Sequence, residues 1–295
     1  MRLSRVSCAS HLARGMRSVH TRPQPLHLQS ESPLIRPHNV ASSSSSSSAV
    51  IAKPNDFLLW PEFFNVEETK ALLQMALWKL DRVDSSLKRR RKGKDTPKSL
   101  TTSSVEADEL QSLFNRQYGF KEGHYDSVIH RYRETLLSSL PPSPSSTLVS
   151  SLSKLYSLLP RRQEHQSQSI STEVDADLEN LPPQGTITHL LHLSPEGEIL
   201  PHVDNLEASG SVICGVSLGA ERTLRLQHKD RKNEGWDVRL NSGSVYLQRD
   251  SIRYNYEHSI LPYPSDGSVW DGQRLKAGHR ISIMIRDSPS KPAQL

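Results

Sequence analysis

The chain has 295 residues, of which 35% are hydrophobic and 19 are proline, a composition that fits one folded core with unfolded segments around it. Its two cysteines, Cys8 and Cys214, exclude a disulfide-stabilised secreted domain and indicate a reducing compartment. The net charge of +5 lies entirely in residues 1–50, which hold six arginines and one glutamate, so the remainder lacks the basic excess of a general nucleic-acid binder. The sequence contains no run of about 18 apolar residues that could span a bilayer.

The first thirty residues combine arginine, serine and small apolar residues, and no acidic residue precedes Glu31. This composition is typical of a mitochondrial transit peptide, and the continuous apolar segment of a secretory signal is missing. A disordered basic tail is the alternative. The serine run Ser42–Ser48 cannot bury apolar surface. We therefore predict that residues 1–50 are a leader for the mitochondrial matrix and a disordered linker, and that the folded part begins near Ile51.

Residues 51–183 are predicted to form a helical N-terminal extension. Asn65 can cap a helix, with Glu68 three residues later as its partner in a capping box, and leucines follow at helical spacing over residues 66–80. Two further helices, each ended by proline, are expected over residues 126–140 and 146–159. The stretch from Arg161 to Gly185 has no periodicity, which indicates a flexible linker.

A dense basic run extends from Lys88 to Lys98 within a polar loop after the first predicted helix. Such a run is either a solvated loop or a contact for phosphate groups. The sequence therefore leaves nucleic acid as a possible partner through this loop.

After residue 184 the sequence changes to short runs that are rich in β-branched and aromatic residues and separated by turn signals. The predicted strands are Thr186–Leu193, Ile199–Asp204, Ser211–Leu218, Arg222–His228, Trp236–Leu240, Gly243–Gln248, Arg253–Ile260 and Arg280–Arg286. This many short strands predict an antiparallel jelly roll, also called a double-stranded β-helix, over residues 184–288, with a tail at residues 289–295. The expected fold class is mainly β with N-terminal helices, in a monomer.

Three His-x-Asp pairs are candidates for metal ligands, and they are His124/Asp126, His202/Asp204 and His228/Asp230. Spacing alone is a weak signal, because thirteen histidines produce such pairs by chance. The first pair lies at the entry to a predicted helix and the third in a charged hairpin tip. The middle pair lies on a predicted strand, where residues i and i+2 face the same side. With His258 on a later strand, His202 and Asp204 complete the two-histidine, one-carboxylate triad of iron oxygenases and are predicted to be catalytic.

Arg280 and Arg286 are separated by an even number of positions on the last predicted strand, so both guanidinium groups are expected on one face. Each can form two hydrogen bonds with a carboxylate. The isoleucines between them, Ile281, Ile283 and Ile285, would then face the opposite, apolar side.

A His-x-Asp pair, a distal His and an Arg-x5-Arg pair, in that order on β segments, resemble the AlkB family of Fe(II) and 2-oxoglutarate dependent dioxygenases. The segments most similar to its mitochondrial branch are Leu200–Asp204, Gly243–Tyr246, Arg253–His258 and Gly278–Ser282. The resemblance implies that the triad binds Fe(II) and that 2-oxoglutarate is the cosubstrate. It also implies that Arg280 pairs with the distal carboxylate of the cosubstrate, that Arg286 lies near the metal-chelating end, and that Tyr246 forms a hydrogen bond with it. The repair enzymes of the family carry an Asn-x-Tyr pair where this chain has Leu191 and Leu193, so their cosubstrate contacts do not transfer directly.

The mitochondrial branch is linked to programmed necrosis and fatty-acid metabolism and is said to lack the nucleotide-flipping lid, which favours protein or peptide side chains as substrates. Demethylation of N-methylated bases in mitochondrial RNA or DNA is an alternative. It would need the basic run and stacking aromatics, for which Trp236 and Trp270 are candidates. A second alternative is a regulatory binding protein that holds iron and cosubstrate without turnover.

Overall fold

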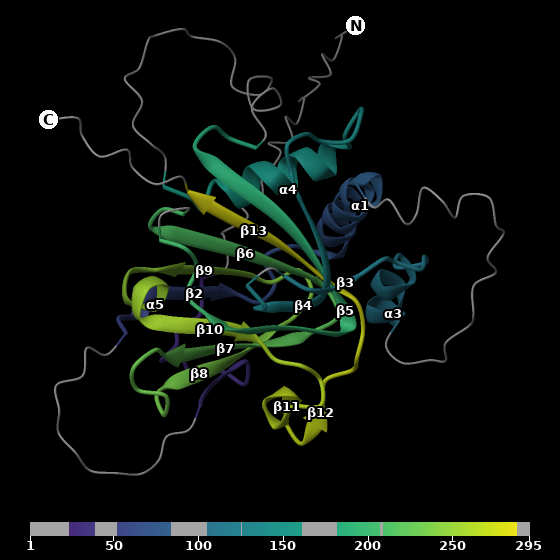
Figure 1. The fold of residues 1–295 in the computed structure, drawn as a ribbon. Helices are drawn as coiled ribbons and strands as arrows, with labels where there is room; N and C mark the ends of the chain where they lie inside the picture. The colour runs from purple at the N-terminus through teal and green to yellow at the C-terminus, as the bar shows by residue number, and fades with distance from the viewer. Residues whose placement is uncertain are drawn as a thin grey trace, which may run out of the picture.

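The computed structural model describes residues 24–38, 52–83, 105–124, 126–160, 182–206 and 209–287. Most of the predicted leader and linker, the basic run from Lys88 to Lys98, the stretch 161–181 and the predicted tail lie outside these residues. The described chain forms a strongly curled antiparallel sheet with few helices (Figure 1). The predicted class, mainly β with a jelly-roll core, is confirmed.

Within the described ranges, eleven strands form the curled sheet, and two more form a separate hairpin. The strands are β1 (Ile35–Pro37), β2 (Phe57–Trp60), β3 (Lys121–Gly123), β4 (Ile129–Leu136), β5 (Thr186–His202), β6 (Val212–Gly219), β7 (Arg222–His228), β8 (Gly235–Leu240), β9 (Val245–Arg249), β10 (Tyr256–Ile260), β11 (Val269–Trp270), β12 (Gln273–Arg274) and β13 (Arg280–Asp287). Neighbouring strands of the sheet follow the order β1, β8, β7, β10, β5, β13, β6, β9 and β2, with β4 pairing to β5 and β3 to β4. Strands that are distant in sequence are thus neighbours, which is typical of a jelly roll.

The outer face of the sheet is covered by α1 (Val66–Val83) and α4 (Ser146–Tyr156), which lie above β13 and β6 in Figure 1. The three isoleucines of β13 are fully buried in the apolar cluster that these helices share with the sheet. Because side chains alternate along a strand, Arg280, Met284 and Arg286 face the inner side. The alternation predicted for this strand is confirmed, and it directs both arginines toward the interior of the roll.

Local hydrogen bonds explain where the helices begin. Asn65 Oδ1 accepts from the backbone N–H of Glu68, and the Glu68 carboxylate accepts from the backbone N–H of Asn65, both at 2.9 Å. This reciprocal capping box confirms the predicted start of α1. The predicted helix at residues 146–159 is confirmed as α4, which is capped by Ser145. Two short helices, α3 (Val105–Ser112) and α5 (Asp250–Asn255), are additions that the sequence does not predict.

The predicted helix over residues 126–140 is wrong, because β4 occupies this stretch and pairs along its length with β5. Ile129, Tyr132 and Thr135 favour a pleated strand, and pairing with β5 outweighs the weak helical periodicity. The predicted strand Arg253–Ile260 is correct only in its second half, since α5 precedes β10.

β5 runs without interruption for 17 residues, although the sequence predicts a turn at Pro195–Gly197. The strand pairs with β13 before this point and with β10 after it. At the bend, the fully buried guanidinium of Arg222 donates to the carbonyl oxygens of Ser194 and Gly197 at 2.8 and 3.1 Å. The arginine therefore satisfies carbonyl groups that the bend removes from the strand ladder.

The folded part begins earlier than the predicted position near Ile51. Residues 24–38 already contact the sheet, since β1 pairs with β8 and Leu26 forms an isolated bridge to Leu59 of β2. Leu28 and Ile35 are buried in the core on the inner side of the sheet. Two apolar anchors in a short segment give too little periodicity to be recognised in the sequence.

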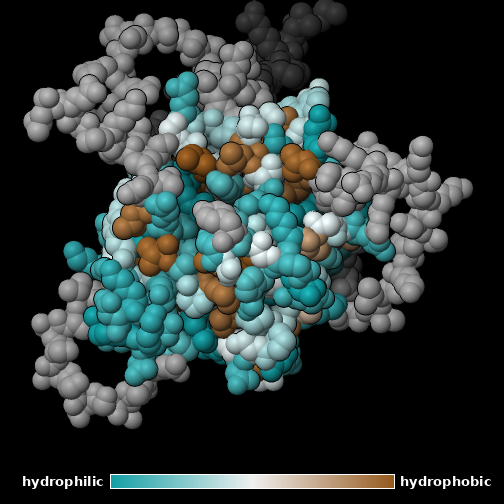
Figure 2. Space-filling view, in the orientation of Figure 1, coloured by the Kyte–Doolittle hydropathy of each residue, from teal (hydrophilic) through white to brown (hydrophobic). Residues whose placement is uncertain are grey.

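Hydrophilic residues predominate on the face seen in Figure 2, and apolar residues reach it in separate clusters. Most large apolar side chains are instead buried in two clusters, one on each side of the curled sheet. Over the described ranges, no helix combines the length and the apolar character needed to cross a bilayer, as the sequence predicts.

Candidate metal centre and cosubstrate pocket

The three predicted metal ligands meet at the end of β5. β10 pairs antiparallel with β5, and this register sets His258 opposite His202. Nε2 of His202 and Nε2 of His258 lie 3.4 and 3.8 Å from Oδ1 of Asp204. One ligand atom from each residue lies within 4.8 Å of the other two. Two imidazole nitrogens and one carboxylate oxygen form the donor set that suits Fe(II), with coordination positions left for further ligands.

Hydrogen bonds from outside the triad orient its ligands. Nδ1 of His202 lies 2.9 Å from the carbonyl oxygen of Leu200, which can only accept, so Nδ1 carries the hydrogen and Nε2 is free to bind a metal. Arg286 donates to Oδ2 of Asp204 at 2.8 Å, which leaves Oδ1 for the centre. The buried guanidinium of Arg253 donates to the main-chain oxygen of Asp204 at 3.2 Å. The carboxylate is thus fixed at both its backbone and its side chain.

The electrostatics of the centre favour the deprotonated forms of Asp204 and His258. Burial raises the pKa of Asp204, but its contact with the His202 ring and the nearby His258 and Arg286 lower it by more, so it lies well below its ordinary value. Burial, reinforced by His202, lowers the pKa of His258 to about 3. Burial also lowers the pKa of His202, but its contacts with Asp204 and Leu200 outweigh this and the pKa is raised overall. At pH 7 the centre therefore offers a carboxylate and a neutral His258, the forms that bind metal.

A second group of polar side chains lies on the inner face of β13, β6 and β9. The guanidinium of Arg280 is 1% exposed, and its Nε donates to the Ser217 hydroxyl at 3.0 Å. Its Nη2 has no hydrogen-bond partner among the described residues. Burial raises the pKa of Tyr246 to about 12, so its hydroxyl remains a donor; it lies 3.4 Å from the sulfur of Met284. A buried guanidinium without a counter-charge is costly, so this pocket suits a carboxylate.

Glycine at position 215 is what allows Tyr246 to lie here. Gly215 of β6 pairs with Tyr246 of β9, and a Cβ at this position would collide with the tyrosine ring. A glycine inside a predicted strand is a signal of such a close approach. Arg253 and Ser217 also contribute to the centre, but as single polar residues in a β region they show no spacing pattern. None of these three residues is predicted from the sequence.

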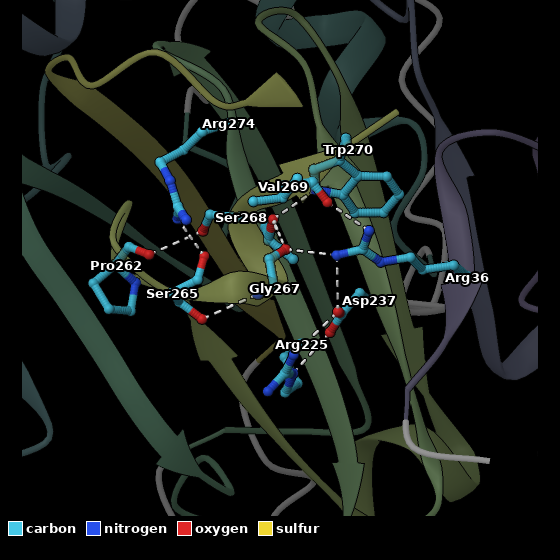
Figure 3. Close-up of polar contacts among 11 residues, drawn as sticks. Arg36, Arg225, Asp237, Pro262, Ser265, Gly267, Ser268, Val269, Trp270 and Arg274 are labelled. Atoms are coloured by element: carbon cyan, nitrogen blue, oxygen red, sulfur yellow. Dashed lines mark hydrogen bonds and ion pairs between the residues drawn. The ribbon is translucent and has the colours of Figure 1, made fainter. Parts of the chain in front are cut away.

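The other candidate residues lie apart from this centre. His124 and Asp126 pair with each other at 2.8 Å beside the β3–β4 hairpin. His228 accepts two backbone N–H groups at 3.1 Å and so caps the turn that follows it. Trp270 is 3% exposed and donates to a threonine hydroxyl, and Trp236 packs against the inner core. Trp270, with Arg36 over its ring (Figure 3), therefore has no free face for a stacked base, whereas Trp236 is only partly buried.

The sequence profile of the 2OG-Fe(II) oxygenase superfamily matches residues 58–286. The matched range includes the triad and the polar pocket on β13, β6 and β9. The chain therefore belongs to this superfamily, and it is a 2-oxoglutarate-dependent dioxygenase.

Within the superfamily, the chain is of the AlkB type. It is 32% identical over 187 residues to the mitochondrial alpha-ketoglutarate-dependent dioxygenase alkB homolog 7 of Bos taurus, a match that covers 61% of this chain and 73% of the bovine protein. The protein of the same name from Mus musculus is 30% identical over 174 residues, which is 59% of this chain and 68% of the mouse protein. A crystal structure of a Pseudomonas putida prolyl-4-hydroxylase has a TM-score of 0.41 and 11% sequence identity, covering 80% of this chain and 93% of that one. The predicted family is confirmed by the two relatives.

Proposed function

We propose that the chain holds Fe(II) and 2-oxoglutarate in this centre and uses them to hydroxylate a protein side chain. The metal ligands are His202, Asp204 and His258. The cosubstrate contacts are Arg280, Tyr246 and Arg286. The observation that carries the proposal is the convergence of three ligand atoms within 4.8 Å in a fold that also buries a guanidinium with an unpaired nitrogen. Tyr246 is close enough to both groups that the charges of Arg280 and Asp204 each affect its pKa.

When bound, Fe(II) and 2-oxoglutarate would supply the oxidising chemistry, in which the substrate C–H group, O2 and the cosubstrate give a hydroxylated product, succinate and CO2. The residues of the chain position these partners. Arg286 occupies one oxygen of Asp204, so the carboxylate offers a single oxygen to the metal. Arg280 would pair with the distal carboxylate of the cosubstrate, and Tyr246 would donate a hydrogen bond to the cosubstrate. Leu191 and Leu193 belong to the apolar core beside Tyr246 and keep water from the pocket.

Side chains next to the triad support a protein or peptide substrate. Leu200, Leu206 and Tyr254 flank the ligands in sequence and are 37%, 54% and 39% exposed. Exposed apolar and aromatic side chains are typical of surfaces that bind other proteins. The burial of Trp270, one of the two candidate tryptophans, argues against base stacking by that residue and so weakens the case for demethylation of RNA or DNA.

The cellular setting follows from the relatives and the leader. Both similar proteins are named mitochondrial, and the arginine-rich, acid-free start of this chain has the composition of a transit peptide. We therefore propose the mitochondrial matrix as the site of action. A link to programmed necrosis and fatty-acid metabolism is proposed from the family resemblance.

The proposal is tested by measuring the decarboxylation of 2-oxoglutarate by purified protein with Fe(II), with and without peptides from mitochondrial proteins. His202→Ala and His258→Ala should each lower turnover at least about 100-fold, because the metal loses a ligand. His124→Ala is the matched control, since its ring pairs with Asp126, outside the triad. Iron binding without any decarboxylation would instead identify a regulatory binding protein. Stimulation by methylated RNA but by no peptide would favour the demethylase.

A further inference from the structure

The outer edge of β4 is only partly covered by another strand. β3 pairs with β4 no further than Tyr132, and no strand within the described ranges pairs with the outer edge of residues 133–136. On the other edge, the N–H of Leu137, directly after the strand, donates to a main-chain carbonyl oxygen of β5 at 2.9 Å. Because the main-chain groups of an antiparallel strand point to its two edges in alternation, those of Glu134 and Leu136 point away from β5. They form a short open edge to which a further strand can add.

The side chains of this open edge lie on the inner face of the sheet, in line with the cosubstrate pocket. Leu136 pairs with His189 of β5, and His189 pairs with Met284 of β13. Paired residues of neighbouring strands share one face, and the sulfur of Met284 lies 3.4 Å from the Tyr246 hydroxyl. Leu136 is 50% exposed, whereas Met284 and Tyr246 are buried. This row of side chains therefore leads from solvent at the edge of β4 into the pocket.

His189 is a polar side chain within this row that a substrate can use. It is half-buried, and its ring forms no hydrogen bond with the part of the chain that the structure describes. Burial and the charge of Arg286 lower the pKa of His189 by more than the charges of Glu134 and Asp204 raise it. Its ring is therefore neutral at pH 7 and can accept a hydrogen bond. These influences also show that His189 is close to both Glu134 and the metal ligand Asp204.

Glu134 supplies negative charge on the same face. It pairs with Leu191 of β5, which belongs to the inner core, so the Glu134 side chain also lies on the inner side. Its carboxylate is 27% exposed and lies 3.8 Å from Nζ of Lys121 and 3.9 Å from Nε2 of His124. The side chain of Lys121 is 60% exposed, and ion pairs in such contact with water are weak. A cation carried by a substrate can therefore replace Lys121 beside Glu134.

From these features we infer that the protein substrate binds as an extended strand along the open edge of β4 and carries a lysine or arginine side chain that pairs with Glu134. The inference rests on the proposed function, because it takes a protein as the substrate. Main-chain hydrogen bonds to Glu134 and Leu136 hold the segment whatever its sequence, and the Glu134 carboxylate supplies the selectivity. It is a specificity-determining residue.

The width of the sheet explains why the selected side chain is long. A strand added to β4 lies two strand spacings, or roughly 10 Å, from β5, which ends at the metal ligand His202. A short side chain on the added strand does not extend over β4 toward the ligands. Lysine and arginine are the long side chains whose charge is opposite to that of Glu134.

The first test measures how far peptides stimulate the decarboxylation of 2-oxoglutarate by the purified full chain with Fe(II). Short synthetic peptide libraries carry lysine, arginine, norleucine or glutamate at a fixed central position. The lysine or the arginine library should stimulate at least about tenfold more than the norleucine library. Equal or greater stimulation by norleucine or glutamate would overturn the inference while leaving a protein substrate in place. If no library stimulates although decarboxylation proceeds without peptide, the inference and the protein substrate both fail.

The second test replaces the selecting carboxylate. Glu134→Gln should lower the ratio of kcat/KM between a lysine peptide and its norleucine counterpart at least about tenfold. A merely structural role would lower kcat/KM for both peptides alike and leave this ratio unchanged, which would overturn the inference. Glu122→Gln is the matched control, because its side chain lies on the neighbouring β3 and is 82% exposed, and it should change the ratio less than about twofold.

The third test removes one main-chain donor from the open edge. Leu136→Pro deletes the N–H that points away from β5, and it should raise the KM for the lysine peptide about tenfold or more. Leu136→Ala keeps this N–H and is the matched control, with a change below about threefold. N-methylation of alternate peptide bonds in the lysine peptide makes the same test without altering the protein. Equal KM values for the two variants, together with no effect of N-methylation, would show that the edge does not bind the substrate main chain.

Discussion

Replacing Arg222 with methionine should destabilise the fold by about 1 to 4 kcal/mol. Its guanidinium is fully buried and makes two short hydrogen bonds, at 2.8 and 3.1 Å, to the carbonyl oxygens of Ser194 and Gly197. Charge-assisted bonds of this kind contribute roughly 1.5 to 3 kcal/mol each, and the contact with the Tyr263 ring at 3.8 Å adds about 1 kcal/mol. Burial lowers the pKa of Arg222 to about 10 from 12.5, which corresponds to a cost of about 3 kcal/mol for burying the charged guanidinium. Methionine does not bear this cost, but the loss of the hydrogen bonds and the ring contact is larger.

The free energy of unfolding should be measured by urea denaturation, with the slope against urea compared between variants to check that the unfolded state is unchanged. Arg116→Met is the control, because its guanidinium is half exposed and its ion pair with Asp81 should contribute less than about 1 kcal/mol. Arg222→Lys keeps the charge but cannot reach both carbonyl groups and should fall between the parent protein and Arg222→Met. A stability of Arg222→Met equal to or above that of the parent would refute the role of this arginine in holding the bend of β5.

Two further predictions concern the outer face and the cosubstrate pocket. Burial lowers the pKa of His279 from 6.5 to about 4, so its neutral form contributes stability that is complete above pH 6.5 and is lost as the pH falls toward 4. Urea denaturation at several pH values across this range should show that His279→Phe loses less free energy of unfolding than the parent protein. An equal loss in the two proteins would contradict the role of His279. Gly215→Ala should displace the Tyr246 ring and raise the KM for 2-oxoglutarate about tenfold or more, with iron binding retained. Gly123→Ala, which has room for the methyl group, is its control, and an unchanged KM in Gly215→Ala would remove Tyr246 from the pocket.

The convergence of the three candidate ligands could be predicted in part from strand pairing. His202 is the last residue of β5, and antiparallel pairing with β10 sets His258 opposite it. The predicted strand Ile199–Asp204 extends two residues too far, because Asp204 follows the end of β5. Side-chain alternation along a strand directs Arg280 and Arg286 to the inner face of β13. The ion pair of Arg286 with Asp204 could not be predicted, because it depends on how far the sheet curls. The binding of metal and cosubstrate by these residues stays a prediction.

The fold was predictable where local signals and tertiary pairing agree. The capping box of Asn65 and Glu68 defines the start of α1 within four residues, so no distant contact is needed to recognise it. The stretch that forms β4 carries a weak helical pattern that conflicts with its final structure. Its strand depends on β5, which lies more than fifty residues further along the chain, and a local pattern cannot report such a partner.

The arginines that support the fold around the site are the hardest residues to predict from the sequence. The reason is the kind of group to which they donate hydrogen bonds. Arg36, Arg222 and Arg253 all donate to main-chain carbonyl oxygens, a partner that every residue provides. No pairing of residue types marks such a contact, whereas a metal ligand or an ion pair needs particular side chains at particular spacings. Each of these arginines acts where the chain leaves regular pairing, at the loop after β10, at the bend of β5 and after the ligand Asp204. Substituting them should therefore change the geometry of the metal centre while every ligand is still present, an effect that ligand motifs alone would not predict.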